Sequence, residues 1–352
     1  MSVPLIYPKP QPDQKRYKKI LEEGFRKYPE RYENFQKYTK AIKGNTVNYL
    51  PVKLDVENVS RCNLQCDMCQ VASFPNYKRA RDMTFEEFKN MVDEQCGLVE
   101  IKIQGMGEPF LGKDFIQMVE YASGKSIWTR TSTNATLLQV NENYKRIIDA
   151  DIGELQISVD GTTKETYEKI RQKANFNRMV ENCKKINQYC EKRGIDKTRM
   201  WVLLQKENLK DIYRFPGFAK ELEFKRVAVI LDVNGWGDKN WTCKNKDKKV
   251  SSCITQAEVD DTLEQAEKCG IQMGFWDISS KYSVKNPCPW PFERAYISSD
   301  MKVVPCCMIA NPDTFHLGTL GSFREIWEGL SYQQFRESHV TGKIPEVCRY
   351  CY

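Results

Sequence analysis

Two hydrophobic periodicities alternate along most of the chain. Short apolar runs typical of buried strands are separated by stretches with the spacing of amphipathic helices. Thr84 opens one helix candidate with a capping-box sequence, and Phe85, Phe88 and Val92 follow on one face. Alternating strands and helices predict a parallel sheet covered by helices. Six such units over residues 51–270 predict an α/β fold, a partial (β/α)6 TIM-like barrel. The strand candidates are 52–59, 99–104, 126–133, 154–159, 200–204 and 226–233.

The pattern changes at both ends of this region. Residues 1–50 contain a proline-rich leader and then charged helical stretches, so we predict a helical extension that packs on the barrel. A leader-peptide-binding domain is the alternative, but this stretch lacks the strand patterns that such a domain needs. Residues 271–352 are predicted to form a second, small α+β domain that ends with a helix near 322–335. Its strand candidates are 272–275, 295–298 and 302–304.

The composition is that of an ordinary soluble protein, with 41% hydrophobic and 29% charged residues among 352. No apolar run approaches the roughly 18 residues of a membrane-spanning helix, and the N-terminus lacks the apolar core of an export signal. We therefore expect a cytoplasmic protein that binds no membrane. The net charge of +7 is mild. Basic residues are not interleaved with stacking aromatics, so nucleic acid is not an expected partner.

The 14 cysteines provide the clearest chemical signal. Without an export signal they favour metal binding or catalysis over disulfides, because cytosolic thiols stay reduced. Cys62, Cys66 and Cys69 have Cys-x3-Cys-x2-Cys spacing just after the first strand candidate. Three thiolates can ligate three irons of a four-iron cluster and leave the fourth iron open. The alternative is a zinc or redox site, but zinc would need a nearby fourth ligand, and His316 and His339 are far away in sequence.

This spacing, with Met68 before the last cysteine, resembles the signature of the radical S-adenosylmethionine (radical SAM) enzymes. The resemblance implies that S-adenosylmethionine (SAM) chelates the open iron. Its reductive cleavage then gives a 5′-deoxyadenosyl radical that takes a hydrogen atom from a substrate. An external reductant such as flavodoxin or ferredoxin is implied as a partner. The chemistry is expected at the carboxyl ends of the parallel strands.

Several strand ends match the SAM-binding positions of this family. By resemblance, Glu108 in the Gly-Met-Gly-Glu sequence of residues 105–108 binds the methionyl ammonium, although the family usually has Gly-Gly-Glu. Arg171 is implied at the methionyl carboxylate, where a guanidinium offers paired donors. The structural alternatives are a tight turn at 105–109 and a helix cap near Thr162. Asn134 and Asp160 could face the substrate instead of the cofactor. The remaining implied cofactor contacts are Met68, Gly105, Gly107, Asn134, Ser158 and Asp160.

A second set of cysteines lies in the C-terminal part. It resembles the Twitch domain, the shortened form of the SPASM extension, and so implies one auxiliary [4Fe-4S] cluster. The chain stops before the additional cysteines of a full SPASM domain, which favours a single auxiliary cluster. Structural zinc is the alternative, because four cysteines also suit zinc, and Cys307 could replace its neighbour as a ligand. The set consists of Cys288, Cys306, Cys348 and Cys351.

The substrate is less well defined by the sequence. Residues 232–241 mix acids, amides and indoles after the sixth strand, which suits a polyhydroxyl ligand, although tryptophans can equally close a core. The layout resembles the aminocyclitol (2-deoxy-scyllo-inosamine) dehydrogenases, so we expect oxidation or epimerisation of a sugar or aminocyclitol. Cys243 or Cys253 could donate a hydrogen atom. The alternative is a maturase that modifies a peptide or protein side chain. An electron-transfer or cluster-carrier protein would not explain Glu108 and Arg171.

Overall fold

The computed structural model of the chain describes residues 5–277 and 281–352. Its strands form one sheet in the order β10-β9-β8-β1-β2-β3-β4-β5-β6-β7. All neighbouring pairs from β8 to β7 are parallel, whereas β9 and β10 run antiparallel to their neighbours. The strands are β1 (Lys53–Val56), β2 (Glu100–Ile103), β3 (Trp128–Thr133), β4 (Glu154–Ser158), β5 (Thr198–Leu203), β6 (Arg226–Ile230), β7 (Gln272–Trp276), β8 (Arg294–Ile297), β9 (Lys302–Val304) and β10 (Gly318–Thr319).

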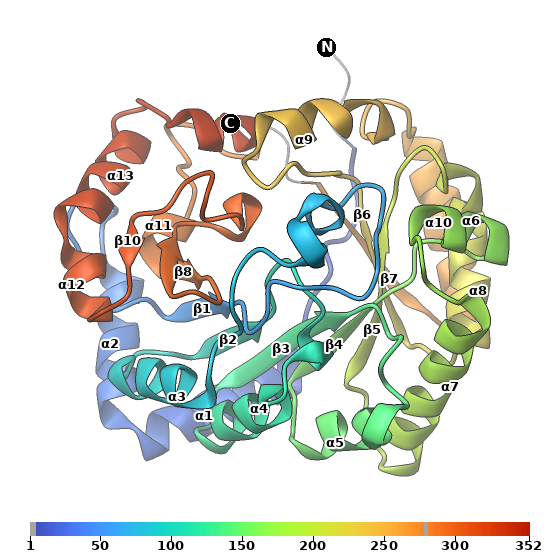
Figure 1. Cartoon of the computed structure of the whole chain (residues 1–352), viewed down its shortest axis with the longest axis horizontal. Coiled ribbons are helices and arrows are strands. Elements are labelled where there is room, and N and C mark those ends of the chain that lie inside the picture. Colours follow the sequence, from blue (N-terminus) through green and yellow to red (C-terminus); the bar gives the residue numbers. More distant parts are fainter. Residues whose placement is uncertain (1–4, 278–280) are drawn as a thin grey trace.

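Helices surround the curved sheet (Figure 1). Capping boxes start two of them, at Thr84 with Glu87 and at Thr255 with Glu258, as the first of these sequences predicts. No helix among the described residues is long and apolar enough to cross a membrane. The helices are α1 (Gln14–Lys27), α2 (Pro29–Lys40), α3 (Phe85–Glu94), α4 (Phe115–Gly124), α5 (Asn143–Asp149), α6 (Lys164–Ile170), α7 (Phe176–Lys192), α8 (Phe215–Glu221), α9 (Lys239–Lys244), α10 (Gln256–Cys269), α11 (Trp290–Glu293), α12 (Phe323–Glu328) and α13 (Leu330–Val340).

The predicted partial TIM-like barrel with a small C-terminal part is confirmed, but the parallel sheet extends beyond the six predicted strands. β7 pairs with β6, and β8 pairs with β1. The first segments of the predicted small domain therefore continue the sheet of the barrel. Because β7 has five residues and β8 has four, hydrophobic periodicity detects them as strands but cannot assign them to a sheet.

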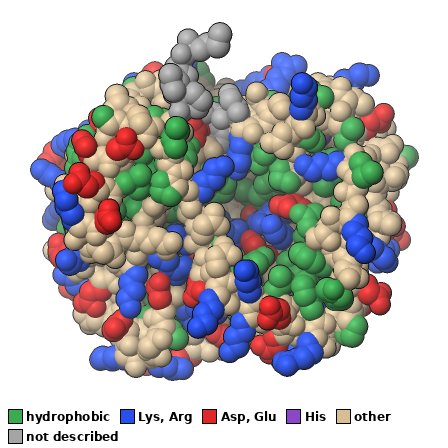
Figure 2. Space-filling model, turned by 180° about the vertical axis from the view of Figure 1, so that it is seen from behind, with side chains coloured by type: hydrophobic (Ala, Val, Ile, Leu, Met, Phe, Trp, Pro, Cys, Tyr) green, Lys and Arg blue, Asp and Glu red, His purple; other side chains and the backbone are tan. Residues whose placement is uncertain are grey.

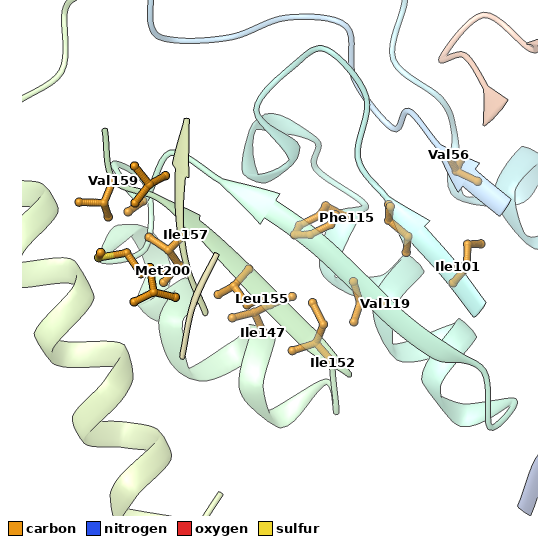
Figure 3. Close-up of a cluster of buried hydrophobic side chains, with 14 of the residues drawn as sticks. Val56, Ile101, Phe115, Val119, Ile147, Ile152, Leu155, Ile157, Val159 and Met200 are labelled. Carbon is orange, nitrogen blue, oxygen red and sulfur yellow. The ribbon is translucent and has the colours of Figure 1, made fainter. Parts of the chain in front are cut away.

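The outer face of the sheet is apolar and packs against the helices. Phe115 and Val119 of α4 and Ile147 of α5 point toward Ile101 and Leu155 of the strands (Figure 3). Each of these side chains is fully or almost fully buried. Burial of apolar area on this face supplies the main driving force for closing helices onto the sheet.

The opposite face of the sheet carries buried charges, because successive side chains of a strand point to opposite faces. Arg294 of β8 bonds Asp55 of β1 at 2.8 Å and Glu100 of β2 at 3.0 Å. Arg199 of β5 bonds Glu154 of β4 at 2.9 Å. From behind, Figure 2 shows blue and red side chains inside a hollow near the middle of the molecule. The barrel interior is therefore polar and suited to a polar ligand.

The N-terminal residues close one end and one edge of the barrel. Arg16 of α1 donates to the carbonyl of Ile152, which precedes β4, at 3.1 Å. Tyr17 packs edge-on against Trp128 at the start of β3. Upstream, the carbonyl of Pro8 accepts from the amide of Phe275 at 2.9 Å, so the leader runs along β7, the edge strand. This arrangement leaves the carboxyl ends of the strands as the accessible end.

One buried carboxylate connects three distant segments. Glu57, just after β1, accepts from the guanidinium of Arg79 at 3.0 Å and from the amide of Met106 at 3.0 Å. It also accepts from the amide of Ser299, in the turn between β8 and β9, at 3.1 Å. Arg79 in turn bonds Asp300 at 2.7 Å. The network fixes the loop after β1 and the turn after β2 relative to the C-terminal part.

Replacing Arg79 with methionine leaves Glu57 as an unpaired buried charge. Breaking a buried ion pair in this way costs about 3–5 kcal/mol, so we expect the free energy of unfolding of the cluster-free protein to fall by that amount in urea titrations. Lys184→Met is the matched control, because Lys184 and Glu221 form an exposed pair at 3.1 Å whose loss costs less than about 1 kcal/mol. Equal losses for the two variants would contradict this role of Arg79.

Candidate functional site

The three-cysteine segment lies in the loop at the carboxyl end of β1. Backbone bonds hold this loop to the end of α6: the amide of Gln65 donates to the carbonyl of Gln172 at 3.0 Å, and the amide of Asp67 to that of Ile170 at 3.3 Å. On the other side, Asn63 donates to the hydroxyl of Thr136 at 2.8 Å. The loop is thus fixed by the end of α6 on one side and by the segment after β3 on the other.

The structure brings the three predicted ligands together. Cys62, Cys66 and Cys69 are free thiols that pack around the same small apolar group. The pKa of Cys69 is raised to about 12, mainly by burial and secondly by the charge of Cys66. Burial, and after it the charge of Glu108, also raises the pKa of Cys62. Buried thiols with raised pKa values become thiolates when a cation binds them, so this donor set fits an iron–sulfur cluster.

Glu108 lies beside this cluster loop, at the turn after β2. Its carboxylate accepts from the hydroxyl of Thr133 at 2.7 Å, the amide of Asn134 at 2.8 Å and the amide of Phe110 at 3.4 Å. A carboxylate offers about four acceptor positions, so one remains for the predicted ammonium. Burial raises the pKa of Glu108 to about 7, against the lowering effect of these hydrogen bonds and of Arg171. A bound cation would favour its ionised form.

Arg171 and Asp160 form a buried pair. The guanidinium contacts one carboxylate oxygen at 2.7 and 2.8 Å, and the other oxygen accepts from the amide of Leu203 at 2.8 Å. Burial alone would lower the pKa of Arg171, but Asp160 and then Cys66 outweigh it and raise that pKa. Arg171 therefore lies near the cluster ligands as a fixed cation. One carboxylate oxygen of Asp160 thus positions Arg171 and the other is bonded to the backbone of β5, and the predicted contact of Asp160 with the cofactor stays a prediction.

Two other predicted contacts are used within the protein. The side chain of Asn134 donates to Asn63 at 3.0 Å and to the sulfur of Cys62 at 3.8 Å, so it supports the cluster loop. The Met68 carbonyl accepts from the amide side chain of Asn245 at 3.0 Å. Ser158 ends β4 and pairs in register with Trp201 of β5. Its contact with the cofactor stays a prediction.

The two glycines before Glu108 are required by packing against the protein. A Cβ atom on Gly105 would lie 2.3 Å from the side chain of Glu57. One on Gly107 would lie 2.4 Å from the carbonyl oxygen of Val59. Both distances are far below van der Waals contact, so no larger residue fits without backbone movement. Packing within the protein therefore already demands glycine at both positions, and their contact with the cofactor stays a prediction.

Sequence reasoning missed two buried amides that complete the loop. Asn245, just after α9, contacts the carbonyls of both Met68 and Asn234 at 3.0 Å. Gln70 donates to the carbonyl of Gly235 at 2.6 Å and accepts from Asn311 at 2.9 Å. The bonds made by Gln70 and the one to Met68 join residues 165 or more positions apart, and no local motif could have indicated them.

The second cysteine set also comes together in space. Its four members line one cavity beside α11 and α13, whereas Cys307 does not line it and lies near Asp55 and Lys102 of the barrel interior. Among the described residues, no three His, Cys, Asp or Glu side chains converge tightly enough to hold a single metal ion. Four thiols around a shared space suit a larger iron–sulfur cluster. The four are Cys288, Cys306, Cys348 and Cys351.

A large open pocket borders the second cysteine set. It has a volume of about 970 Å³ and is lined by residues 233–249, around α9, and by two segments of the C-terminal part, 308–314 and 346–351. Cys351 belongs to its lining. Asn245, which bonds the cluster loop, lies in the same α9 segment. In Figure 1, α9 and the C-terminus lie next to each other at one end of the molecule.

Comparisons with known proteins assign the class. Residues 56–216 match the model of the Radical SAM superfamily, and residues 288–352 match SPASM, an iron–sulfur cluster-binding domain. The chain therefore contains a radical SAM domain and a C-terminal SPASM domain. Its cofactors are SAM, a SAM-binding [4Fe-4S] cluster and an auxiliary cluster. The expected fold, the radical SAM class and the cofactors are thus confirmed, whereas the expected dehydrogenase or epimerase type is not.

The chain is similar to proteins of several activities. It is 24% identical over 311 residues to a PqqA peptide cyclase of Bradyrhizobium diazoefficiens, covering 86% of this chain and 79% of the relative. It is 26% identical over 316 residues to an AdoMet-dependent heme synthase of Methanosarcina barkeri, covering 84% and 86%. The structure of Streptococcus suis SuiB bound to precursor peptide SuiA shares the fold, with a TM-score of 0.65 and 14% identity over 87% of this chain and 71% of SuiB.

Glu108→Gln is expected to weaken SAM binding by about 10- to 100-fold at pH 7.5, because a hydrogen bond to a charged group contributes about 1.5–3 kcal/mol. Since the pKa of Glu108 is raised to about 7 by burial, its negative charge develops as the pH rises through 7. Wild-type affinity should therefore increase from about pH 6 to 7.5, and the variant should lose this increase.

Equilibrium dialysis of labelled SAM against cluster-loaded protein measures this effect. Iron content should stay unchanged in the variant, and Glu221→Gln, at an exposed site, serves as the control. A Glu108→Gln protein that binds SAM with wild-type affinity and the same pH dependence would remove Glu108 from the cofactor site.

Proposed function

We propose that this radical SAM enzyme is a maturase that modifies a peptide or protein side chain. The observation that carries the proposal is the open pocket of about 970 Å³ between the α9 segment and the SPASM domain. Its volume lies at the upper end of the range for small-molecule sites. Because the pocket is open, a chain segment can enter it while its ends remain in solvent.

The relatives named above support a peptide substrate. One is named as a peptide cyclase, and the solved SuiB structure holds a precursor peptide. The similarity to a heme synthase favours a competing class of substrate, a small molecule related to tetrapyrroles. The pocket borders residues that hold the cluster loop and a cysteine of the auxiliary set. A peptide side chain in it would lie beside the auxiliary cluster site.

The geometry of residues 232–241 argues against the sugar or aminocyclitol that the sequence suggested. Asp232 is buried and bonded to the hydroxyl of Tyr350. Asn234 accepts from the amide of Trp236 at 2.9 Å, and Asp238 caps α9 by accepting from the amide of Trp241 at 2.9 Å. Three of the polar groups assigned to sugar hydroxyls are therefore engaged by protein partners.

The hydrogen donors suggested by the sequence lie outside the barrel interior. Cys243 and Cys253 are both exposed, and of the two only Cys243 borders the pocket. An exposed thiol meets solvent and competing oxidants, which makes it a poor partner for a sequestered radical. Epimerisation by these thiols is consequently not part of the proposal.

In the proposed reaction the chain's own residues bind and orient the reactants. The SAM-bound cluster supplies the 5′-deoxyadenosyl radical. Glu108 and Arg171 present a carboxylate and a fixed guanidinium to the two charged ends of the methionyl group. Gln70 and Asn245 hold the cluster loop against the pocket wall. The pocket then places a substrate C–H bond near the cofactor, and its walls keep bulk water away from the substrate radical.

Anaerobic, cluster-loaded enzyme should convert a peptide encoded beside its gene, or a member of a random peptide library, to a product of altered mass in step with 5′-deoxyadenosine formation. Mass spectrometry and nucleoside analysis measure the two products. The matched arms contain 2-deoxy-scyllo-inosamine or an iron porphyrin in place of the peptide. Substrate-dependent nucleoside formation with either small molecule, and with no peptide, would contradict the proposal.

A further inference from the structure

Basic side chains dominate the charged lining of the pocket beside α9. They come from both walls: three from the α9 segment and one from the C-terminal segment of the SPASM domain. The acidic side chains in the lining are mostly engaged, as the contacts below show. The basic residues are Lys239, Lys246, Lys249 and Arg349, and the acidic residues are Asp238, Asp313 and Glu346.

The three acidic side chains each have a partner. Glu346 pairs with Lys239 at 2.7 Å. Asp313 pairs with Lys302, outside the lining, at 2.9 Å. Asp238 accepts from the amide of Trp241 as the N-cap of α9. Two of the three are therefore neutralised by lysines, whereas Asp238 keeps its charge at the N-terminus of α9.

Two of the cations in the lining, Lys246 and Arg349, form no ion pair within the described residues, although the charge of Arg349 helps to lower the pKa of Glu346. A third, Lys249, stacks on the ring of Tyr350 at 4.0 Å from its centroid. Burial lowers the pKa of Lys249, although the charges of Asp232 and Asp277 oppose this. An anion entering the pocket would face cations on both of its walls, and such a site attracts carboxylates.

The neighbouring lysines Lys244 and Lys248 are engaged in ion pairs and add little to this field. Lys244 and Lys248 both pair with Asp67 of the cluster loop, and Lys248 also contacts Glu207 at 2.9 Å. Their ion pairs connect the α9 segment to the loop that carries the cluster ligands. The cationic wall is thus anchored at the reaction site, and a substrate bound to it would be held at a fixed distance from that site.

We infer that this pocket selects a peptide substrate with an acidic segment, whose Asp or Glu carboxylates bind Lys246, Lys249 and Arg349. The inference rests on the proposed peptide-modifying function and adds the chemistry of the substrate. The carboxylates anchor the chain on both walls of the pocket, and the residue to be modified is positioned in the pocket.

Binding can be tested without catalysis by fluorescence anisotropy of labelled octaglutamate and octaglutamine with the cluster-loaded protein. Octaglutamate should bind at least tenfold more tightly, and raising the ionic strength from about 50 to 300 mM should weaken it, because salt screens exposed charges. Lys246→Glu and Arg349→Glu should each weaken octaglutamate binding at least tenfold. Lys220→Glu in α8 changes the net charge equally, at an exposed site outside the pocket lining, and should leave binding nearly unchanged.

Equal binding of the two peptides, or equal weakening by Lys220→Glu, would overturn the inference. Circular dichroism and iron content verify that each variant is folded and loaded. If the enzyme binds octaglutamate tightly but modifies no peptide, the anion-binding site is supported and the proposed function is refuted. If the enzyme modifies peptides regardless of their charge, the proposed function is supported and the preference for an acidic segment is refuted.

Discussion

The carboxylate of Glu57 is the constraint on which the arrangement of this active site depends. It is fully buried and binds Arg79, the amide of Met106 and the amide of Ser299. Arg79 follows the cysteine loop in sequence, Met106 lies in the turn that presents Glu108, and Ser299 belongs to the SPASM domain. A buried charge with good hydrogen bonds tolerates little displacement, because each lost bond leaves a desolvated group. The two cluster sites are thereby held in a fixed relation across the sheet.

Around this fixed frame the polar residues divide into two groups. Asn134, Asp160 and Asn245 use their side chains on protein partners and hold the cluster loop and Arg171. Glu108 keeps one acceptor position free, and Arg171 lies near the cluster ligands as an oriented cation. Such preorganisation lowers the cost of ordering side chains when the cofactor binds. Polar residues that the sequence does not distinguish therefore have different roles: some hold the protein around the site, and others are placed to contact the cofactor.

The sequence predicted what short-range spacing determines. The cysteine triad, the glutamate after the second strand and the alternation of strands and helices are all local patterns, and each leads to the observed class and fold. Contacts across the chain were not predictable in this way. Gln70 meets Gly235 and Asn311, and β8 joins β1 although more than 200 residues separate them. A sequence also cannot show that the side chain of Glu57 occupies the space beside Gly105 and so requires glycine there.

The central claim is that Cys62, Cys66 and Cys69 hold a cluster with one iron open to SAM, while the SPASM cysteines hold a separate one. Electron paramagnetic resonance of the reduced protein, recorded with and without SAM, tests it directly. Addition of SAM should change the signal of one cluster only; this response should persist in Cys348→Ala and be absent in Cys66→Ala. A SAM response that survives in Cys66→Ala, or one that is lost only in Cys348→Ala, would contradict the account.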